Sequence, residues 1–219
     1  MASCDSVAAL FGRRNIKEGC EDPCVLGDES IMSMKAHGTS ETPVQDPLRW
    51  GCDVSVADRI ANFNRRYAER SGYWVRTSFL AETTAEGIPS EENPITFFDS
   101  NSGKPIFRAP IGRTWQEFVR ESRSHGWPSF RDQEVVWDNV RVLVNGETVS
   151  VDGKTVVRPS DASSIIVSLK LVLVWALSFS SGLIPTGTHL GHNLPDGQGN
   201  RFCINLVSIA GNPEADDGR

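Results

Sequence analysis

Residues 142–157 read Val-Leu-Val-Asn-Gly-Glu-Thr-Val-Ser-Val-Asp-Gly-Lys-Thr-Val-Val. Two Xaa-Gly pairs, Asn145-Gly146 and Asp152-Gly153, separate runs that are rich in β-branched residues. Such a pair between two β-branched runs is a strong signal for a hairpin turn. The stretch therefore predicts a meander of antiparallel strands at 142–144, 148–151 and 155–157.

The rest of the chain predicts a further strand and two helices. Residues 204–209 read Ile-Asn-Leu-Val-Ser-Ile, which predicts a last strand. Between Ser55, which can cap a helix, and Gly72, which can end one, apolar residues recur at helical spacing: Val56, Ile60, Phe63 and Tyr67. The stretch Thr114-Trp-Gln-Glu117 matches a capping box and predicts a second, short helix.

Composition favours a globular protein with a polar first segment. The 219 residues are 39% hydrophobic and 23% charged, near the globular average. Residues 1–54 mix Gly, Ser, Asp, Glu and Pro with few apolar runs, so we expect a disordered arm that carries Cys4, Cys20, Cys24 and Cys52. We assign 55–93 to a helix and connector, 94–211 to the main domain and 212–219 to an acidic tail.

Charge and cysteine content restrict the partners and the compartment. The net charge of −6 gives no global basic field for nucleic acid phosphates. Five cysteines are too few for a disulfide-stapled small domain. The first residues have no basic flank and are interrupted by polar residues, so they do not resemble a secretory signal. We expect a soluble protein in a reducing compartment, the cytoplasm by default.

Residues 187–205 hold the densest run of reactive side chains: His189, His192, Asp196, Arg201 and Cys203. Arg201 lies two residues before Cys203, so on a strand both side chains would project from one face. A cation beside a thiol favours the thiolate, which is the nucleophile. The imidazoles and the carboxylate could donate protons to a leaving oxygen. The pattern suits attack by a thiol on an electrophilic centre.

Two other interpretations of this run stay open from spacing alone. A lone cysteine is more often a small buried hydrophobe than a nucleophile. His-x-x-His with a distant cysteine could also form part of a metal site, although the run lacks a Cys-x-x-Cys pair. Spacing does not choose between these interpretations and catalysis.

Five motifs occur in order between about residue 94 and residue 211: Gly103-Lys-Pro-Ile-Phe107, Gly126-Trp-Pro-Ser-Phe130, His189-Leu-Gly-His192, Asp196-Gly197 and Arg201-Phe-Cys-Ile-Asn205. In this order they resemble the methionine-R-sulfoxide reductase (MsrB) family. The resemblance implies a mainly β fold of two antiparallel sheets with short flanking helices. It also implies an oxidoreductase that repairs proteins after oxidative stress by reducing methionine-R-sulfoxide.

The resemblance assigns a role to each matching side chain. Cys203 matches the nucleophile, and Arg201 matches the residue that lowers the pKa of the thiol. The residues that bind or polarise the sulfoxide match His189, His192, Asp196 and Asn205. Trp127 matches the indole that holds the S-methyl group, and Phe130 is assigned to the substrate site with it. These roles require that solvent reach the Cys203 sulfur and that both imidazoles face it.

The implied reaction consumes a methionine-sulfoxide-containing protein and a thiol. The Cys203 thiolate attacks the sulfoxide sulfur, methionine leaves, and Cys203 becomes a sulfenic acid. A second thiol or a thioredoxin-like protein then restores the thiol. The alternative, from a different class, is a catalytically inactive MsrB-like β module that binds protein partners.

The sequence departs from the family at the zinc and resolving-cysteine positions. Many members bind zinc through two Cys-x-x-Cys pairs, and the corresponding positions here hold other residues: Asp99, Ser102, Pro159 and Ala162. We therefore expect no zinc and no other cofactor. The position of the common resolving cysteine holds His125, so a resolving thiol would have to come from the arm, as Cys4, Cys20, Cys24 or Cys52. A flexible arm could bring one of them to the site.

The third departure is an apolar segment, 163–186, that interrupts the family pattern. Residues 165–184 are just long enough to span a bilayer, but Lys170, Gly182 and Pro185 argue against a membrane helix. Three interpretations are open: a genuine hydrophobic insertion, a membrane anchor or an error in the gene model. A single span cannot return both flanks to one membrane face, so a membrane role is disfavoured. We favour the gene-model error, because the flanks join into a family-like sequence without the segment.

Overall fold

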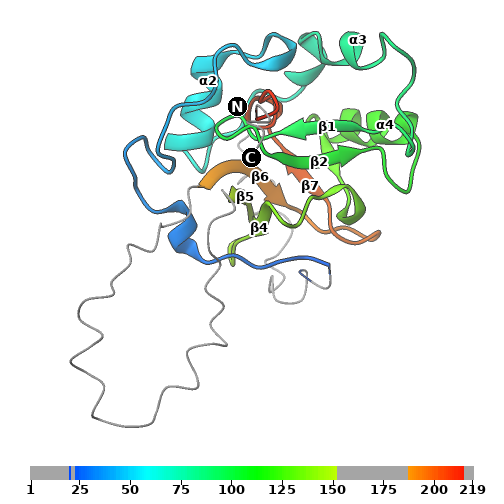
Figure 1. Cartoon of the computed structure of the whole chain (residues 1–219). Helices are drawn as coiled ribbons and strands as arrows, with labels where there is room; N and C mark the ends of the chain where they lie inside the picture. Colours follow the sequence, from blue (N-terminus) through cyan, green and yellow to red (C-terminus); the bar gives the residue numbers. More distant parts are fainter. Residues whose placement is uncertain (1–19, 21–22, 152–186, 215–219) are drawn as a thin grey trace, which may run out of the picture.

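The hairpin predicted at Asn145-Gly146 is present. β4 (Val140–Val142) pairs antiparallel with β5 (Glu147–Val151), and Gly146 takes a positive φ of 86° in the turn. The structure, a computed structural model, describes residues 20, 23–151 and 187–214 (Figure 1). The third predicted strand of the meander, 155–157, lies outside these residues.

β4 and β5 belong to a five-stranded antiparallel sheet. Its order is β3-β7-β6-β5-β4, with the remaining strands at Ser129–Phe130 (β3), Gly187–Asn193 (β6) and Phe202–Ile204 (β7). The last strand therefore ends at Ile204 and does not continue to Ile209 as predicted. At Asn205 the main-chain N–H and the side-chain amide both donate to the Leu190 carbonyl, and a 3-10 turn follows.

A second sheet of two antiparallel strands packs beside the first. It consists of β1 (Ile95–Phe98) and β2 (Pro105–Ala109). Isolated bridges join Phe98 to Ala210 and Phe107 to Val135, and so connect the small sheet to the segments that follow β7 and β3. The expectation of two antiparallel sheets with short helices is confirmed at this level.

The capping box predicted after Thr114 is confirmed. Helix α4 (Trp115–His125) begins where the Thr114 side chain accepts the Glu117 N–H and the Glu117 carboxylate accepts the Thr114 N–H. The helix ends at Gly126, whose φ of 91° suits glycine, and the chain then enters β3. The other short helical segments are α3 at Phe79–Thr83 and 3-10 turns at Glu29–Met32, Arg49–Gly51, Trp74–Arg76, Asp132–Glu134 and Leu206–Ser208.

The helix predicted over 55–72 is shorter than expected. It begins as α2 (Val54–Asp58), capped by the Asp53 carboxylate, and continues as a π-helical segment at Arg59–Phe63. The helix stops there because the chain then turns, and Arg65 enters an ion pair with Glu147 on the sheet. Apolar spacing alone could not show this competing electrostatic contact.

Residues 23–54 are ordered, and the prediction of a disordered arm is wrong for this part of it. Leu26 bridges Val142 on β4, and Ile31 and Met32 form a small buried cluster with three side chains near the β4–β5 hairpin: Leu143, Val149 and Val151. Composition missed this because scattered apolar residues here complete a core that other segments build. The rest of the arm, 1–19 and 21–22, lies outside the described residues.

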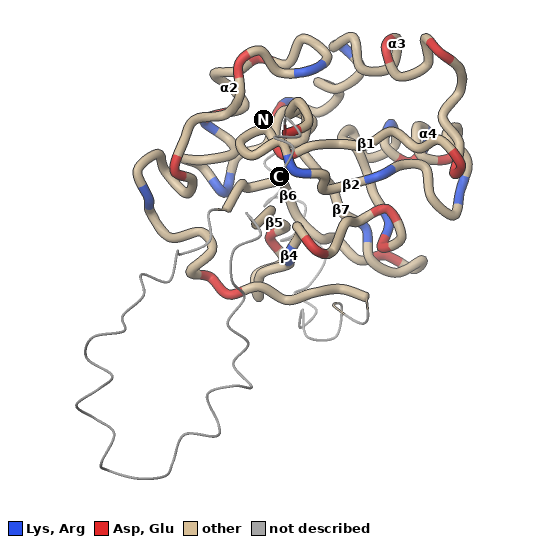
Figure 2. The backbone as a smooth tube through the Cα atoms, viewed as in Figure 1, with Lys and Arg blue, Asp and Glu red and all other residues tan. Residues whose placement is uncertain are grey.

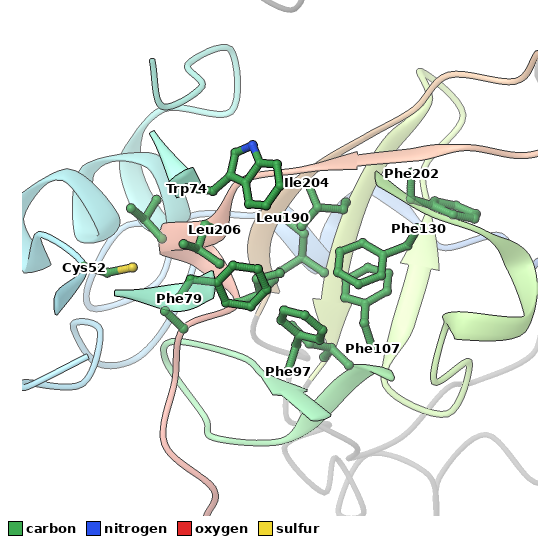
Figure 3. Close-up of a cluster of buried hydrophobic side chains, with 14 of the residues drawn as sticks. Cys52, Trp74, Phe79, Phe97, Phe107, Phe130, Leu190, Phe202, Ile204 and Leu206 are labelled. Carbon is green, nitrogen blue, oxygen red and sulfur yellow. The ribbon is translucent and has the colours of Figure 1, made fainter. Parts of the chain in front are cut away.

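One aromatic cluster fills the space between the two sheets (Figure 3). Phe97 of β1 lies at ring-centroid distances of 5.0–6.4 Å from four rings: Trp50, Phe79, Phe118 and Phe130. Phe107 of β2 stacks on Phe130 of β3 at 4.3 Å. Leu190, Phe202 and Ile204 complete the core from β6 and β7, so one face of these two strands is fixed by apolar packing.

Charged residues of both signs are interspersed along the described chain (Figure 2). Among the residues that the structure describes, no helix combines the length and the hydrophobicity of a membrane span. The apolar segment 163–186 and the end of the acidic tail, 215–219, lie outside those residues.

Candidate functional site

The register of the large sheet places four polar side chains in one row. Cys203 on β7 is the cross-strand partner of His192 on β6 and of Ser129 on β3. Glu147 on β5 is the partner of His192 on the other side. Cross-strand partners project from the same face of a sheet, so this row lies on the face opposite the aromatic core. The neighbours of Cys203 along β7, Phe202 and Ile204, project into the core.

A β-bulge in β6 brings the second histidine to the same place. Residues three apart on a regular strand project from opposite faces. The register between β5 and β6 shifts between Thr148 and Val149, and the rings of His189 and His192 lie edge to face with centroids 5.4 Å apart. Gly191 permits this because a Cβ there would lie 2.1 Å from the Cys203 carbonyl oxygen.

An ion-pair chain holds His189. Its Nδ1 lies 2.7 Å from the Glu147 carboxylate, which also accepts Nε–H of Arg65 at 2.8 Å. Arg65 in turn pairs with Glu29 at 2.8 Å. Burial acts to raise the pKa of Glu147, but the hydrogen bonds from His189 and Arg65 outweigh it and lower that pKa to about 2. Glu147 is therefore a fixed negative charge that orients the imidazole.

A buried imidazole nitrogen lies on the same face of the sheet as the thiol. Among the described residues, Nε2 of His189 is buried and has no hydrogen-bond partner. The Cys203 side chain is only 4% exposed, whereas His192 is partly exposed. Cys203 is buried, so the structure does not bear out the expectation that solvent reaches its sulfur. A buried polar atom without a partner is costly, so Nε2 marks a place where a ligand could bind.

Arg201 and Asp196 lie together at the other end of the site. The Arg201 Nε is 3.5 Å from the Asp196 carboxylate, and within the described part of the chain neither its Nε nor its Nη1 has a hydrogen-bond partner. Burial tends to raise the pKa of Asp196, but the hydrogen bonds from Arg131 at 3.0 Å and the Arg201 charge lower it. Arg201 is buried, and its guanidinium has N–H groups that could donate hydrogen bonds to a ligand.

Trp127 and Asn205 are both held by the main chain of one residue. The indole Nε1–H of Trp127 donates to the Glu69 carbonyl at 3.0 Å, and the Glu69 N–H donates to Oδ1 of Asn205 at 3.0 Å. The amide of Asn205 is also committed to the Leu190 carbonyl at 3.1 Å. Asn205 thus fixes the strands, while Trp127 remains partly exposed beside β3.

The assignment of Phe130 to the substrate site is wrong. Phe130 is the cross-strand partner of Phe202, one position beyond the Ser129–Cys203 pair, so its ring projects from the core face. It is fully buried and contacts the rings of Phe97 and Phe107. The motif alone could not show this, because it does not fix which face of the sheet each position occupies.

One of the four positions compared with zinc ligands, Asp99, holds a hydrogen-bonded carboxylate. Asp99 is buried and accepts hydrogen bonds from the hydroxyls of Ser150 and Thr188 and from the Asn101 N–H. Burial raises its pKa. Ser102 accepts the Lys104 N–H in the β1–β2 turn, and the remaining two positions, Pro159 and Ala162, lie outside the described residues. The structure shows no cluster of three or more metal-ligating side chains over 23–151 and 187–214.

The arm cysteines that were candidate resolving thiols differ in their settings. Cys20 and Cys24 form a disulfide with each other. Cys52 is buried in the aromatic core, and burial raises the pKa of its thiol well above the usual range. Cys4 lies outside the described residues. A thiol that keeps its proton is a poor nucleophile, so Cys52 is unsuited to resolving a sulfenic acid.

None of the sequence motifs includes three residues that contact the candidate site: Arg65, Glu69 and Glu147. Arg65 and Glu69 precede the region of motif resemblance, and only the folded chain brings them to it. Glu147 follows the Asn145-Gly146 turn directly, where a polar residue is unremarkable. Glu147 could have been found only by predicting that its strand pairs with the strand that contains His192. The segment 163–186 separates the two strands in the sequence, so this pairing was not predictable.

Replacing Glu147 by Gln should remove a pH-dependent part of the stability. The native pKa of about 2 lies below the ordinary value of 4.5, so the stabilisation is complete at neutral pH and is lost as the pH falls from about 5 towards 2. The difference in pKa corresponds to about 3 kcal/mol at most. Urea unfolding should show Glu147→Gln to be less stable than wild type at pH 7, with the gap shrinking below about pH 5.

The exposed Glu91→Gln variant is the matched control and should unfold like wild type at every pH. A gap between wild type and Glu147→Gln that stays constant from pH 7 to pH 3 would show that the carboxylate charge does not stabilise the fold.

The described site combines a nearly buried thiol, a partly exposed imidazole and a buried imidazole held by a carboxylate. These groups can supply a sulfur nucleophile and a proton at one point. No protein-family model matches this chain, and comparisons with curated proteins and with solved structures found no match either.

Proposed function

We propose that the chain is a peptide-methionine (R)-S-oxide reductase, a thiol-dependent oxidoreductase that repairs oxidised proteins. One observation carries the proposal: the strand register sets Cys203 opposite His192, and the bulge at Gly191 turns His189 to the same face. A nucleophilic sulfur beside proton-donating groups suits reduction of a sulfoxide. The order of the sequence motifs, which resembles the MsrB family, supports the same reaction.

Cys203 is the proposed nucleophile. Its thiolate forms a bond to the sulfoxide sulfur while the sulfoxide oxygen takes up a proton. The bond between methionine sulfur and oxygen and the new sulfur–sulfur bond then break as the oxygen bonds to the Cys203 sulfur, so that Cys203 becomes a sulfenic acid and methionine leaves as the thioether. One thiol and one sulfoxide thus give one sulfenic acid and one thioether, with the cysteine sulfur oxidised and the methionine sulfur reduced by the same two electrons.

His189 and His192 are the proposed proton donors. Glu147 accepts the hydrogen on Nδ1 of His189, which fixes the orientation of the ring. The buried Nε2 is then left to hydrogen-bond the sulfoxide oxygen. Nε and Nη1 of Arg201 have no hydrogen-bond partner among the described residues. The Arg201 charge is proposed to favour the thiolate form of Cys203.

The substrate is proposed to be a methionine sulfoxide side chain of a protein. Cys203 is buried and its cross-strand partner His192 is partly exposed, so an unbranched, flexible side chain is proposed to enter beside His192. Trp127, whose indole is fixed by its bond to the Glu69 carbonyl, is proposed to contact the S-methyl group. Charges of both signs are interspersed along the described chain, which suits unfolded or oxidised protein segments better than nucleic acid.

A thioredoxin-like protein is the proposed reductant, acting in the cytoplasm. Cys52 is a poor candidate for the resolving thiol, because burial and the nearby carboxyl groups of Glu69 and Glu82 raise the pKa of its thiol. In a reducing compartment, a disulfide such as Cys20–Cys24 is ordinarily redox-active and not structural. We propose that the external dithiol reduces the Cys203 sulfenic acid directly, in two thiol exchanges that release water.

Wild-type protein should reduce a peptide that contains methionine-R-sulfoxide, with dithiothreitol as reductant. Cys203→Ser should lose turnover by a factor of about 10³ or more, because serine is a far weaker nucleophile at neutral pH. The Cys20→Ser/Cys24→Ser double variant is the matched cysteine control and should keep its turnover. Loss of its turnover with a thioredoxin-like protein as reductant, but not with dithiothreitol, would place the resolving thiol in the arm.

No turnover by wild type or by Cys203→Ser would support the alternative, a catalytically inactive β module that binds proteins. Equal turnover by both would show that the chemistry lies elsewhere in the chain. Chromatographic measurement of the methionine peptide formed decides between these outcomes.

The proposed enzyme uses no zinc. The Asp99 carboxylate already accepts three hydrogen bonds, from Ser150, Thr188 and Asn101, at the position where zinc-binding relatives place a ligand. Metal analysis of the purified protein should find far less than one zinc per chain. About one zinc per chain that survives dialysis would contradict this expectation.

A further inference from the structure

Glu69 contacts the candidate site at three separate points. Its main-chain N–H donates to Asn205 and its carbonyl accepts the indole N–H of Trp127, each at 3.0 Å. Its carboxylate accepts the Val207 N–H at 3.0 Å, four residues beyond Cys203. Glu69 precedes the region of motif resemblance, so none of the site motifs includes it.

The carboxyl group of Glu69 replaces a missing helix cap. Asn205 occupies the N-cap position of the 3-10 turn Leu206–Ser208, yet its side chain does not cap that turn. The Asn205 side chain is instead bonded to the Glu69 N–H and the Leu190 carbonyl. The Glu69 carboxyl group therefore receives the N–H groups at the start of the turn, those of Leu206 and Val207. Glu69 thus makes hydrogen bonds to the three residues that follow β7: Asn205, Leu206 and Val207.

Ionisation of Glu69 would place negative charge on a second carboxyl oxygen that has no hydrogen-bond donor among the described residues. Within the described chain, Oε1 of Glu69 is buried and has no hydrogen-bond partner. Burial raises the pKa of Glu69 to about 8, although the N–H groups of Val207 and Leu206 partly offset the effect. Near neutral pH the group keeps its proton, and at higher pH it must carry a charge that nothing at Oε1 compensates.

We propose that Glu69 is a positioning residue: its main chain holds Trp127 and Asn205, its buried carboxyl group anchors that main chain to the turn after β7, and ionisation of the carboxyl group loosens the indole and weakens substrate binding. A charged carboxylate gains by moving towards water, and its own main chain carries the bonds to Trp127 and Asn205. The kinetic consequence rests on the proposed function, whereas the movement of the indole does not.

Other titratable groups near Glu69 are accounted for. Cys52 and Tyr73 interact electrostatically with it, and burial raises the pKa of both, so both stay neutral through the range in which Glu69 loses its proton. Asp53 lies beyond Tyr73 and is ionised throughout, because hydrogen bonds lower its pKa. Cys203 is also titratable and precedes the capped turn, so the test compares variants that keep Cys203.

The test follows the indole N–H of Trp127 by NMR in the full-length, ¹⁵N-labelled protein. Trp127→Phe identifies the resonance by its loss. In wild type the resonance should shift with a midpoint near pH 8, and in Glu69→Gln it should not shift over the same range. The exposed Glu86→Gln is the matched control and should titrate as wild type does.

A kinetic measurement extends the test to substrate binding. In wild type, KM for a methionine-R-sulfoxide peptide should rise about threefold or more between pH 7 and pH 9, and in Glu69→Gln it should stay flat. Because KM reports binding of the substrate and Cys203 is unchanged in both proteins, ionisation of the thiol cannot produce the difference.

The outcomes separate this inference from the proposed function. A titrating indole in a protein without turnover supports the role of Glu69 and removes the proposed reaction. If the protein has turnover but the indole N–H resonance does not shift with pH, or shifts equally in Glu69→Gln, the role of Glu69 is overturned and the proposed reaction stands. If Glu69→Gln does not fold, the ¹³C carboxyl spectrum of wild type decides: one glutamate must titrate near pH 8, and titration of every glutamate below about pH 6 overturns the inference.

Discussion

The pairing of β6 with β7 is the contact on which the rest of the site depends. It places Cys203 beside His192 on one face and Phe202 and Ile204 in the aromatic core on the other. A slip of one residue would exchange the two faces and bury the thiol among phenylalanines. The core therefore selects the register, and the register assembles the site. Gly191 makes the close approach possible, since any side chain there would collide with the Cys203 carbonyl.

Electrostatics sets the second constraint. The protein compensates most charges of the site: the buried Glu147 carries hydrogen bonds from both Arg65 and His189, and the exposed Asp196 pairs with Arg131. Among the described residues, compensation is incomplete at Nε2 of His189 and at the Arg201 guanidinium. An unsatisfied buried polar group costs about 1–3 kcal/mol, so these positions favour a ligand that carries an oxygen acceptor.

Motifs of a few adjacent residues correctly predicted the turns and helix ends that depend on those residues alone. The Asn145-Gly146 turn and the capping box at Thr114 are confirmed, because each depends on a few adjacent residues. Contacts between distant segments were not predictable in this way. Arg65 ends a helix early by reaching Glu147, and residues 23–54 fold because a core formed elsewhere accepts their side chains.

The candidate site shows the same division. The run from His189 to Cys203 identified the reactive groups, but only the bulge at Gly191 shows that both imidazoles share a face. The motif that contains Trp127 also contains Phe130, and strand alternation sends the latter into the core. Glu69 had no signal in the sequence, because its bonds to the site come mainly from its main chain.

A single-turnover reaction tests most directly whether the sulfur of Cys203 accepts the sulfoxide oxygen. Fully reduced protein, freed of reductant, is mixed with excess peptide carrying either epimer of methionine sulfoxide. The R epimer should yield about one methionine per chain, with one oxygen added at Cys203 by mass spectrometry or its condensation product with a thiol, and the S epimer should yield none. No methionine from the R epimer, or equal yields from both epimers, would contradict the proposed chemistry.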